Sequence, residues 1–217
     1  GPRLAAQRGR GRSGPMAVRD IDDDAHPLCA VWRRAAAEAG LPRSAGFNAA
    51  STAEAEGVGL YEITTRGGLR MSAARAWLRP ALGRPNLVLR SQAAATRVRF
   101  DEGRRAVGVD YLQGGTVRHA EARREVLLAA GAVHSPLLLQ ASGIGPAALL
   151  RALGLAPVLV NEHVGRHLQD HLCIDHVYRA RVRTLNEELR PWSGRVRAAA
   201  RYLLTRGGPL ALSVNQG

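Results

Sequence analysis

One continuous stretch, Arg124 to Gly145, constrains the fold of this chain more than any other part of the sequence. Its first part, Val126 to Ala130, is an uninterrupted apolar run without alternation, which is typical of a strand covered on both faces of a largely parallel sheet. The run ends in Gly131-Ala132, so the carboxyl end of the predicted strand carries no large side chain. In open α/β sheets, ligands bind at that end of the strands. We therefore predict an α/β fold with a ligand against the main chain at Ala130, Gly131 and Ala132.

A short helix is expected directly after these small residues, which form the crossing from strand to helix. Ser135 supplies an N-cap hydroxyl, Pro136 suits a first helical turn, and Ser142-Gly143 ends the apolar segment. The order of strand, crossing and helix also occurs in α/β domains that hold no cofactor. The pattern alone therefore leaves open a plain β-α pair and a cofactor site.

The residues of this stretch also resemble a known family signature. Gly131-Ala132-x-x-Ser135-Pro136-x-Leu138-Leu139-x-x-Ser142-Gly143-Ile144-Gly145 is similar, at every specified position, to the second signature of the glucose-methanol-choline (GMC) family of FAD-dependent oxidoreductases. Other segments resemble the family in the same order along the chain: Gly14 to Val18, Gly46 to Asn48, Gly57 to Tyr61, Gly68 to Ala74, Arg84 to Leu89, Val164 to His171 and Gly207 to Gly217. The resemblance therefore covers nearly the whole sequence.

The resemblance implies a fold and a set of cofactor contacts. The fold class is α/β: part of an FAD/NAD(P)-binding, Rossmann-like domain with an inserted β-meander, plus part of an α+β substrate domain. Residues 1–47 and 173–217 would belong to the substrate domain, and residues 48–172 to the FAD-binding domain. The implied cofactor-binding residues are Ala95, Ala130, Gly131, Ala132 and Ser135. Ala95 stands where the family has a valine whose main chain meets the adenine of FAD.

The resemblance also implies an activity for the complete protein. It would be a choline dehydrogenase-like flavoprotein that oxidises the CH–OH group of a small-molecule alcohol, with hydride passing to the flavin. The family's glycine loop for the ADP half of FAD and its C-terminal catalytic histidine pair have no match here. We expect a central fragment that is inactive alone, and the first residue, Gly1, agrees with an internal start. No catalytic residue is assigned, and a non-redox relative such as a lyase remains an alternative.

The formal charge of +13 raises a second hypothesis, an Arg-rich nucleic-acid-binding module. All 31 cationic side chains are arginine, and Arg8, Arg10 and Arg12 are the best candidates for phosphate contacts. The arginines are spread along the chain, however, and aromatic residues make up only 4%. This distribution indicates a compositional bias rather than an interface, so no nucleic-acid partner is expected.

Cysteine, histidine and hydropathy patterns limit the remaining classes. Cys29 and Cys173 fit no metal or redox spacing and favour a reducing cytoplasm. No apolar run approaches the roughly 20 residues of a membrane span. His163, His167 and His171 recur every fourth residue and could present metal ligands along a helix, but Gly165 argues against a continuous helix there. No metal is expected.

The hydropathy pattern outside residues 124–145 predicts further short helices and strands. Leu28, Val31, Trp32 and Ala35 fall on one helical face before Gly40, and Asp20 to Asp24 would place negative charge at the start of that helix. Strands are expected at 86–90, 96–100, 106–112, 116–119 and 157–160, and helices from 146 to 153 and from 195 to 204.

Overall fold

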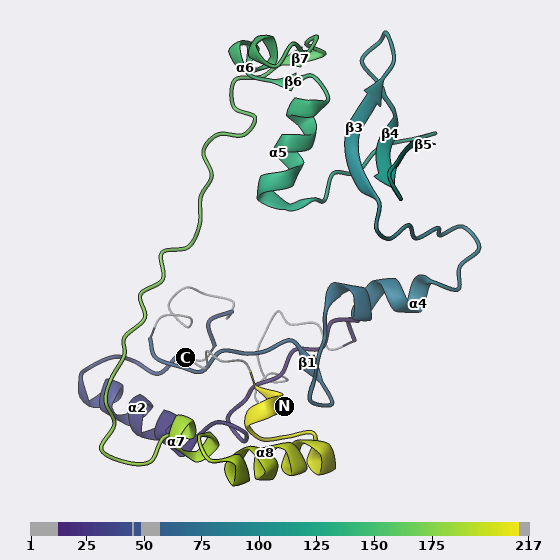
Figure 1. Cartoon of the computed structure of the whole chain (residues 1–217). Coiled ribbons are helices and arrows are strands. Elements are labelled where there is room, and N and C mark those ends of the chain that lie inside the picture. The colour runs from purple at the N-terminus through teal and green to yellow at the C-terminus, as the bar shows by residue number, and fades with distance from the viewer. Residues whose placement is uncertain (1–12, 45, 49–56, 213–217) are drawn as a thin grey trace. The chain divides into compact units, whose positions relative to one another are not determined.

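A computed structural model gives the structure of the chain, and it describes residues 13–44, 46–48 and 57–212 (Figure 1). The chain forms two compact units. The first unit consists of Gly1–Val88 and Val177–Gly217, and the second of Leu89–His176. Both units combine helices with short strands, as the sequence predicts. Among the described residues, no helix reaches the length and apolarity that crossing a bilayer requires.

An antiparallel meander forms the main sheet of the second unit. It consists of β3 (Ala94–Phe100), β4 (Ala106–Gln113) and β5 (Thr116–Glu121), with β4 in the centre. Gln113 pairs with Thr116 across Gly114-Gly115, and both glycines have positive φ, as a two-residue hairpin turn requires. The predicted meander is therefore confirmed. Val98 and Tyr111 are buried, so one face of the sheet forms part of the core.

The helix of the signature packs against this sheet. Helix α5 (Gly131–Ala141) contacts β3, and in Figure 1 both elements begin at the same end. The chain then forms a parallel pair, β6 (Ile144–Gly145) and β7 (Leu159–Val160), connected through α6 (Ala147–Ala152). The side chain of Leu150 in α6 is buried. The helix predicted from 146 to 153 and the strand predicted at 157–160 are both found, in shorter form.

Two predicted strands are wrong. Residues 125–129 pair with no strand in the described part of the chain, and the Leu127 side chain is 79% exposed. Residues 87–90 likewise have no regular structure, and Val88 is 73% exposed. A strand needs a neighbour for its N–H and C=O groups, and an apolar run needs covering on its faces. The described part of the chain supplies neither partner to these two runs.

The first unit is built mainly of helices. In its described residues the helices are α2 (Pro27–Glu38), the helical turns η1 (Ala74–Leu78) and α4 (Arg79–Ala81), α7 (Leu185–Leu189), α8 (Trp192–Thr205) and η2 (Pro209–Ala211), and β1 (Thr65–Arg66) and β2 (Leu69–Arg70) form a small hairpin. The helices predicted after Pro27 and around 195–204 are confirmed as α2 and α8. Among the described residues of this unit, the buried apolar ones are Ile21, Val58, Ile63, Met71, Ala76, Ala198 and Ala211.

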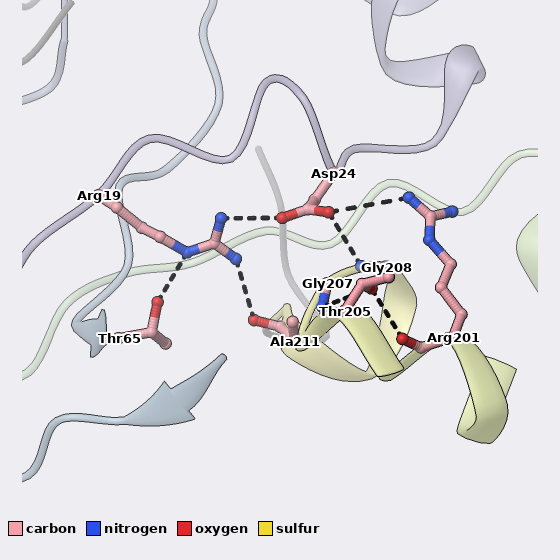
Figure 2. Close-up of polar contacts among 8 residues, drawn as sticks. All are labelled: Arg19, Asp24, Thr65, Arg201, Thr205, Gly207, Gly208 and Ala211. Carbon is pink, nitrogen blue, oxygen red and sulfur yellow. Dashed lines mark hydrogen bonds and ion pairs between the residues drawn. The ribbon is translucent and has the colours of Figure 1, made fainter. Parts of the chain in front are cut away.

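Asp24 joins three segments of the first unit, and it does not place its negative charge at the N-terminus of α2 as the sequence predicts. The N-cap of α2 is His26, whose Nδ1 accepts the Leu28 N–H, so the predicted role of the acidic run is wrong for Asp24. Figure 2 shows its carboxylate between Arg19 and Gly208: Oδ2 lies 2.8 Å from Arg19 Nη1, and Oδ1 accepts the Gly208 N–H at 2.9 Å. Asp22 likewise forms an ion pair with Arg33 at 2.8 Å, so these two carboxylates bind arginines and, for Asp24, a main-chain N–H.

The Arg19 guanidinium extends this network into the hairpin. Its Nε donates to Thr65 Oγ1 at 2.8 Å, and its Nη2 donates to the Ala211 carbonyl at 3.5 Å (Figure 2). Segments that are far apart in sequence are thus held by one ion pair. Because charge-assisted hydrogen bonds are stronger than neutral ones, Asp24 is the polar centre of this unit.

Asp24→Asn is expected to lower the free energy of unfolding of the first unit by about 2 kcal/mol at pH 7. Burial raises the pKa of the Asp24 carboxyl, but the Gly208 N–H and the Arg19 guanidinium outweigh it and hold the pKa below its ordinary value. The stabilisation is therefore fully present above the unfolded pKa, about 3.9, and is lost as the pH falls through the lower folded value. Tryptophan fluorescence during urea unfolding measures it, because Trp32, Trp77 and Trp192 all belong to this unit.

Asp23→Asn is the matched control for this change. Asp23 is exposed and adjacent, and its substitution removes the same charge. A loss of stability equal in the two variants, or one that persists unchanged at pH 2, contradicts the role of the Asp24 ion pair.

Candidate functional site

The start of α5 lies at the small-residue crossing that the sequence predicts as a ligand site. Ala130 is the N-cap, and Gly131 is the first helical residue, with φ of +85°. A Cβ atom placed on Gly131 would meet no atom within 4 Å, so glycine is needed here for its left-handed conformation and not for lack of space. Ala130, Gly131 and Ala132 are all exposed. The main chain at the crossing is therefore open to a ligand.

The helix begins earlier than the sequence predicts. Ser135 is not the N-cap and Pro136 is not in the first turn, because both lie inside α5. The Ser135 hydroxyl instead accepts the Ala130 N–H at 3.1 Å, so it bonds the N-cap residue from within the helix. The left-handed conformation of Gly131 turns the chain into the helix about one turn earlier than a serine cap would.

The first turn of α5 presents main-chain groups without side-chain partners. The first N–H groups of a helix have no acceptor within it, and α5 has no side-chain cap and no acidic residue in its first turn. The carbonyl of Ala132 also lacks its usual partner, since Pro136 has no N–H. The helix dipole makes this end positive. The arrangement suits an anionic or polar group of a ligand lying against the main chain.

A groove runs along α5 from this end. We call it the α5 groove: a hollow of about 360 Å³ between the helix and residues 165–168, lined by Ala132, Val133, Pro136, Leu137, Gln140, Gly165, Arg166 and Leu168. Gln140 Nε2 donates to the Val164 carbonyl at 3.1 Å and so fixes the turn at 162–165 against the helix. A Cβ on Gly165 would collide with that same amide. The groove is mainly apolar and suits the flat apolar part of a ligand.

Ala95, the remaining predicted contact, lies in β3. It pairs with Tyr111 of β4 beside a bulge between Ala95 and Arg97, and its own side chain is exposed. The strand is attached to the helix at its far end by Ser142, which is completely buried. Ser142 Oγ accepts the Val98 N–H at 2.8 Å and donates to the Leu138 carbonyl. The structure thus brings Ala130, Gly131, Ala132 and Ser135 together at the start of α5 and places Ala95 on the strand that α5 contacts.

The structure adds residues that the sequence did not single out. Gln140 and Leu168 line the groove, and Ser142 attaches α5 to β3. Ala132, Pro136 and Gln140 are spaced by four residues and so lie on one face of α5, and this spacing could have indicated the role of Gln140 in the groove. Nothing in a local pattern indicates that Ser142 binds a strand 44 residues earlier in the chain.

The histidines that suggested a metal site do not share a helix. Residues 162–165 form a turn, and Gly165 has φ of +81°. The rings of His163 and His167 lie 5.7 Å apart, but in the described part of the chain no three His, Cys, Asp or Glu side chains are placed to hold a metal ion. Arg8, Arg10 and Arg12, the candidates for nucleic-acid contacts, lie outside the described residues.

His167 has φ of +58°, a left-handed conformation. Asparagine and histidine tolerate this conformation much better than β-branched residues do. We expect His167→Asn to change the free energy of unfolding of the second unit by less than about 0.5 kcal/mol, and His167→Val to lower it by about 1–2 kcal/mol. Hydrogen exchange of peptides from residues 89–176 measures both. His134→Val, at an exposed position in α5, is the control, and equal effects at the two positions would disprove the backbone explanation.

The sequence of this chain is similar to those of known oxidoreductases. The sequence model of the GMC oxidoreductase family matches residues 5–173. The chain is 41% identical to human mitochondrial choline dehydrogenase over 172 residues, and this match covers 79% of this chain and 28% of the relative. It is 45% identical over 163 residues to the oxygen-dependent choline dehydrogenase of Burkholderia ambifaria, covering 75% of this chain and 28% of the relative. The chain thus spans about 28% of the length of these relatives.

Solved structures with a similar fold are also oxidoreductases. An FAD-dependent oxidoreductase from Chaetomium thermophilum matches with a TM-score of 0.83 and 28% identity, covering 100% of this chain and 39% of that protein. A formate oxidase matches with a TM-score of 0.74 and 25% identity, covering 93% of this chain and 35% of that protein.

Proposed function

Because this chain belongs to the GMC oxidoreductase family, we propose that it is a central part of an FAD-dependent oxidoreductase that acts on the CH–OH group of a small-molecule alcohol. The similarity to choline dehydrogenases supports an alcohol as the substrate. FAD, when bound, supplies the acceptor for the hydride of the alcohol carbon. No residue of this chain is given the role of the proton-accepting base.

The single observation that carries the proposal is the open start of α5. The bare main chain at Gly131, the unpartnered first-turn N–H groups and the apolar groove suit a ligand with an anionic part and a flat apolar part. FAD has both. In this proposal the main chain of Gly131 and Ala132 holds the cofactor, Ser135 fixes the turn, and the Ala95 main chain meets the adenine.

The domain assignment is part of the same proposal. Residues 48–172 would contribute to the FAD-binding domain, and residues 1–47 and 173–217 to the substrate domain. The two compact units divide the chain differently, since residues 48–88 lie in the first unit. We also propose a cytoplasmic location, because Cys29 and Cys173 fit no metal or redox spacing, which favours a reducing compartment.

Titration with FAD tests the cofactor contacts. We expect the 217-residue chain to bind FAD weakly and to lose it on desalting, because the chain contains only part of the family's length. NMR spectra should show amide shifts at Gly131, Ala132 and Ala95 that saturate with increasing FAD. Gly131→Ala should reduce the affinity at least fivefold, since it disturbs the left-handed start of α5.

Gly154→Ala is the matched control. Gly154 also has a left-handed conformation and open space around it, but it does not line the groove. The proposed contacts are wrong if FAD shifts no amide near the start of α5, or if the two variants weaken binding equally. Flavin retained after desalting would contradict the expected weak binding.

A further inference from the structure

A second hollow lies in the first unit. It has a volume of about 250 Å³ and is lined by residues of α7, of α8 as far as Arg201, and of the segments around them. Three arginines line it: Arg183, Arg197 and Arg201. We call it the arginine hollow. No part of the α5 groove contributes to it, because that groove belongs to the second unit.

The charges of the arginine hollow are only partly compensated. Arg201 Nη2 lies 3.9 Å from Asp24 Oδ1, the long ion pair drawn in Figure 2. Glu188 also lines the hollow, but its Oε1 lies 3.6 Å from His26 Nε2. Neither the Arg183 nor the Arg197 side chain forms a hydrogen bond or ion pair within the described part of the chain. Two guanidinium groups therefore face one cavity without a carboxylate of their own.

Several apolar side chains complete the wall of the hollow. Leu185, Leu189 and Pro209 line it together with Ala198, which is buried. The cavity therefore offers cationic groups beside an apolar surface. A ligand that uses both has an anionic head and a short apolar body, and the volume is below the range of about 300–1,000 Å³ usual for larger ligands.

We propose that the arginine hollow is a binding site for a small monocarboxylate with an apolar body, about the size of benzoate. The fork of a guanidinium matches the two oxygens of a carboxylate. A singly charged carboxylate also fits better than a doubly charged phosphate, because removing a dianion from water beside the apolar wall costs more free energy and Glu188 repels a dianion more strongly. This site is separate from the proposed FAD contacts, and it does not depend on them.

Titration of the 217-residue chain with benzoate tests the proposal. Amide shifts at Ser193 and Gly194, which line the hollow, should saturate with increasing benzoate. Phenyl phosphate should bind more weakly. Arg197→Ala should reduce benzoate affinity at least tenfold, since it removes one charged partner of the carboxylate. Arg183→Gln should reduce it similarly, and circular dichroism checks that each variant remains folded.

Arg190→Ala is the matched control for charge. Arg190 is exposed, does not line the hollow, and its loss changes the net charge as much as the loss of Arg197. We expect Arg190→Ala to change benzoate affinity less than twofold. The proposal is overturned by absence of saturable shifts, by equal weakening in the two alanine variants, or by tighter binding of phenyl phosphate than of benzoate.

Discussion

Ser142→Ala is expected to lower the free energy of unfolding of the second unit by about 2–3 kcal/mol. The Ser142 side chain is completely buried, and its hydroxyl is the acceptor for the buried Val98 N–H at 2.8 Å. Alanine leaves that N–H without a partner and away from water, which costs more than the loss of an exposed hydrogen bond. Because Val98 is in β3 and Ser142 follows α5, the change loosens the attachment between strand and helix.

Hydrogen exchange at the Val98 amide measures this effect directly. In the parent chain the amide should be among the most protected of the second unit, and in Ser142→Ala its exchange should be faster by about 30-fold or more, the equivalent of 2 kcal/mol. Ser135→Ala is the control, because its hydroxyl bonds an exposed N–H at Ala130. We expect Ser135→Ala to cost less than about 1 kcal/mol. Unchanged protection of Val98 in Ser142→Ala would show that the hydroxyl does not hold β3.

Gly143→Ala is expected to destabilise the second unit by about 2–4 kcal/mol, for two separate reasons. Gly143 has φ of +87°, a conformation that L side chains rarely adopt. A Cβ atom there would also lie 2.7 Å from the carbonyl oxygen of Ala156, which is main chain and cannot rotate away. The Gly143 carbonyl accepts the Val158 N–H at 2.8 Å, so a shift at this point also disturbs the parallel pairing of β6 and β7.

Gly154→Ala separates the two contributions to this effect. Gly154 has a similar left-handed conformation but no atom within 4 Å of the added Cβ, so its substitution costs only the backbone strain, about 1 kcal/mol. Urea unfolding followed by hydrogen exchange of peptides from 89–176 compares the variants. If Gly143→Ala is no more damaging than Gly154→Ala, the close approach to Ala156 has no energetic consequence.

Several elements follow from local sequence because their causes are local. The meander is predicted by alternation at Val107, Val109 and Tyr111 and by two glycines that form a tight turn. Helices α2 and α8 follow from apolar residues at helical spacing. The family was also identified from sequence, through the succession of specific residues from Gly131 to Gly145.

The predicted strand at 126–130 failed because strand formation is not a local property. Its apolar composition is right for a buried strand, but pairing and covering depend on neighbouring segments, which the described part of the chain does not provide. The start of α5 was misplaced for a different reason. Both Gly131 and Ser135 can begin a helix, and composition alone does not decide between a left-handed glycine and a serine cap.

The sequence by itself determined the family, the meander and the principal helices, because each depends on residues close together in the chain. Only the tertiary structure decided that Ser142 holds β3, that Asp24 joins Arg19 to the turn at Gly208, and that separate arginines line one hollow. The Val98–Ser142 and Asp24–Gly208 hydrogen bonds join residues that are 44 and 184 positions apart. Hydrogen bonds and ion pairs act over only a few ångströms, so such pairs form only when the chain packs. No local sequence pattern indicates them.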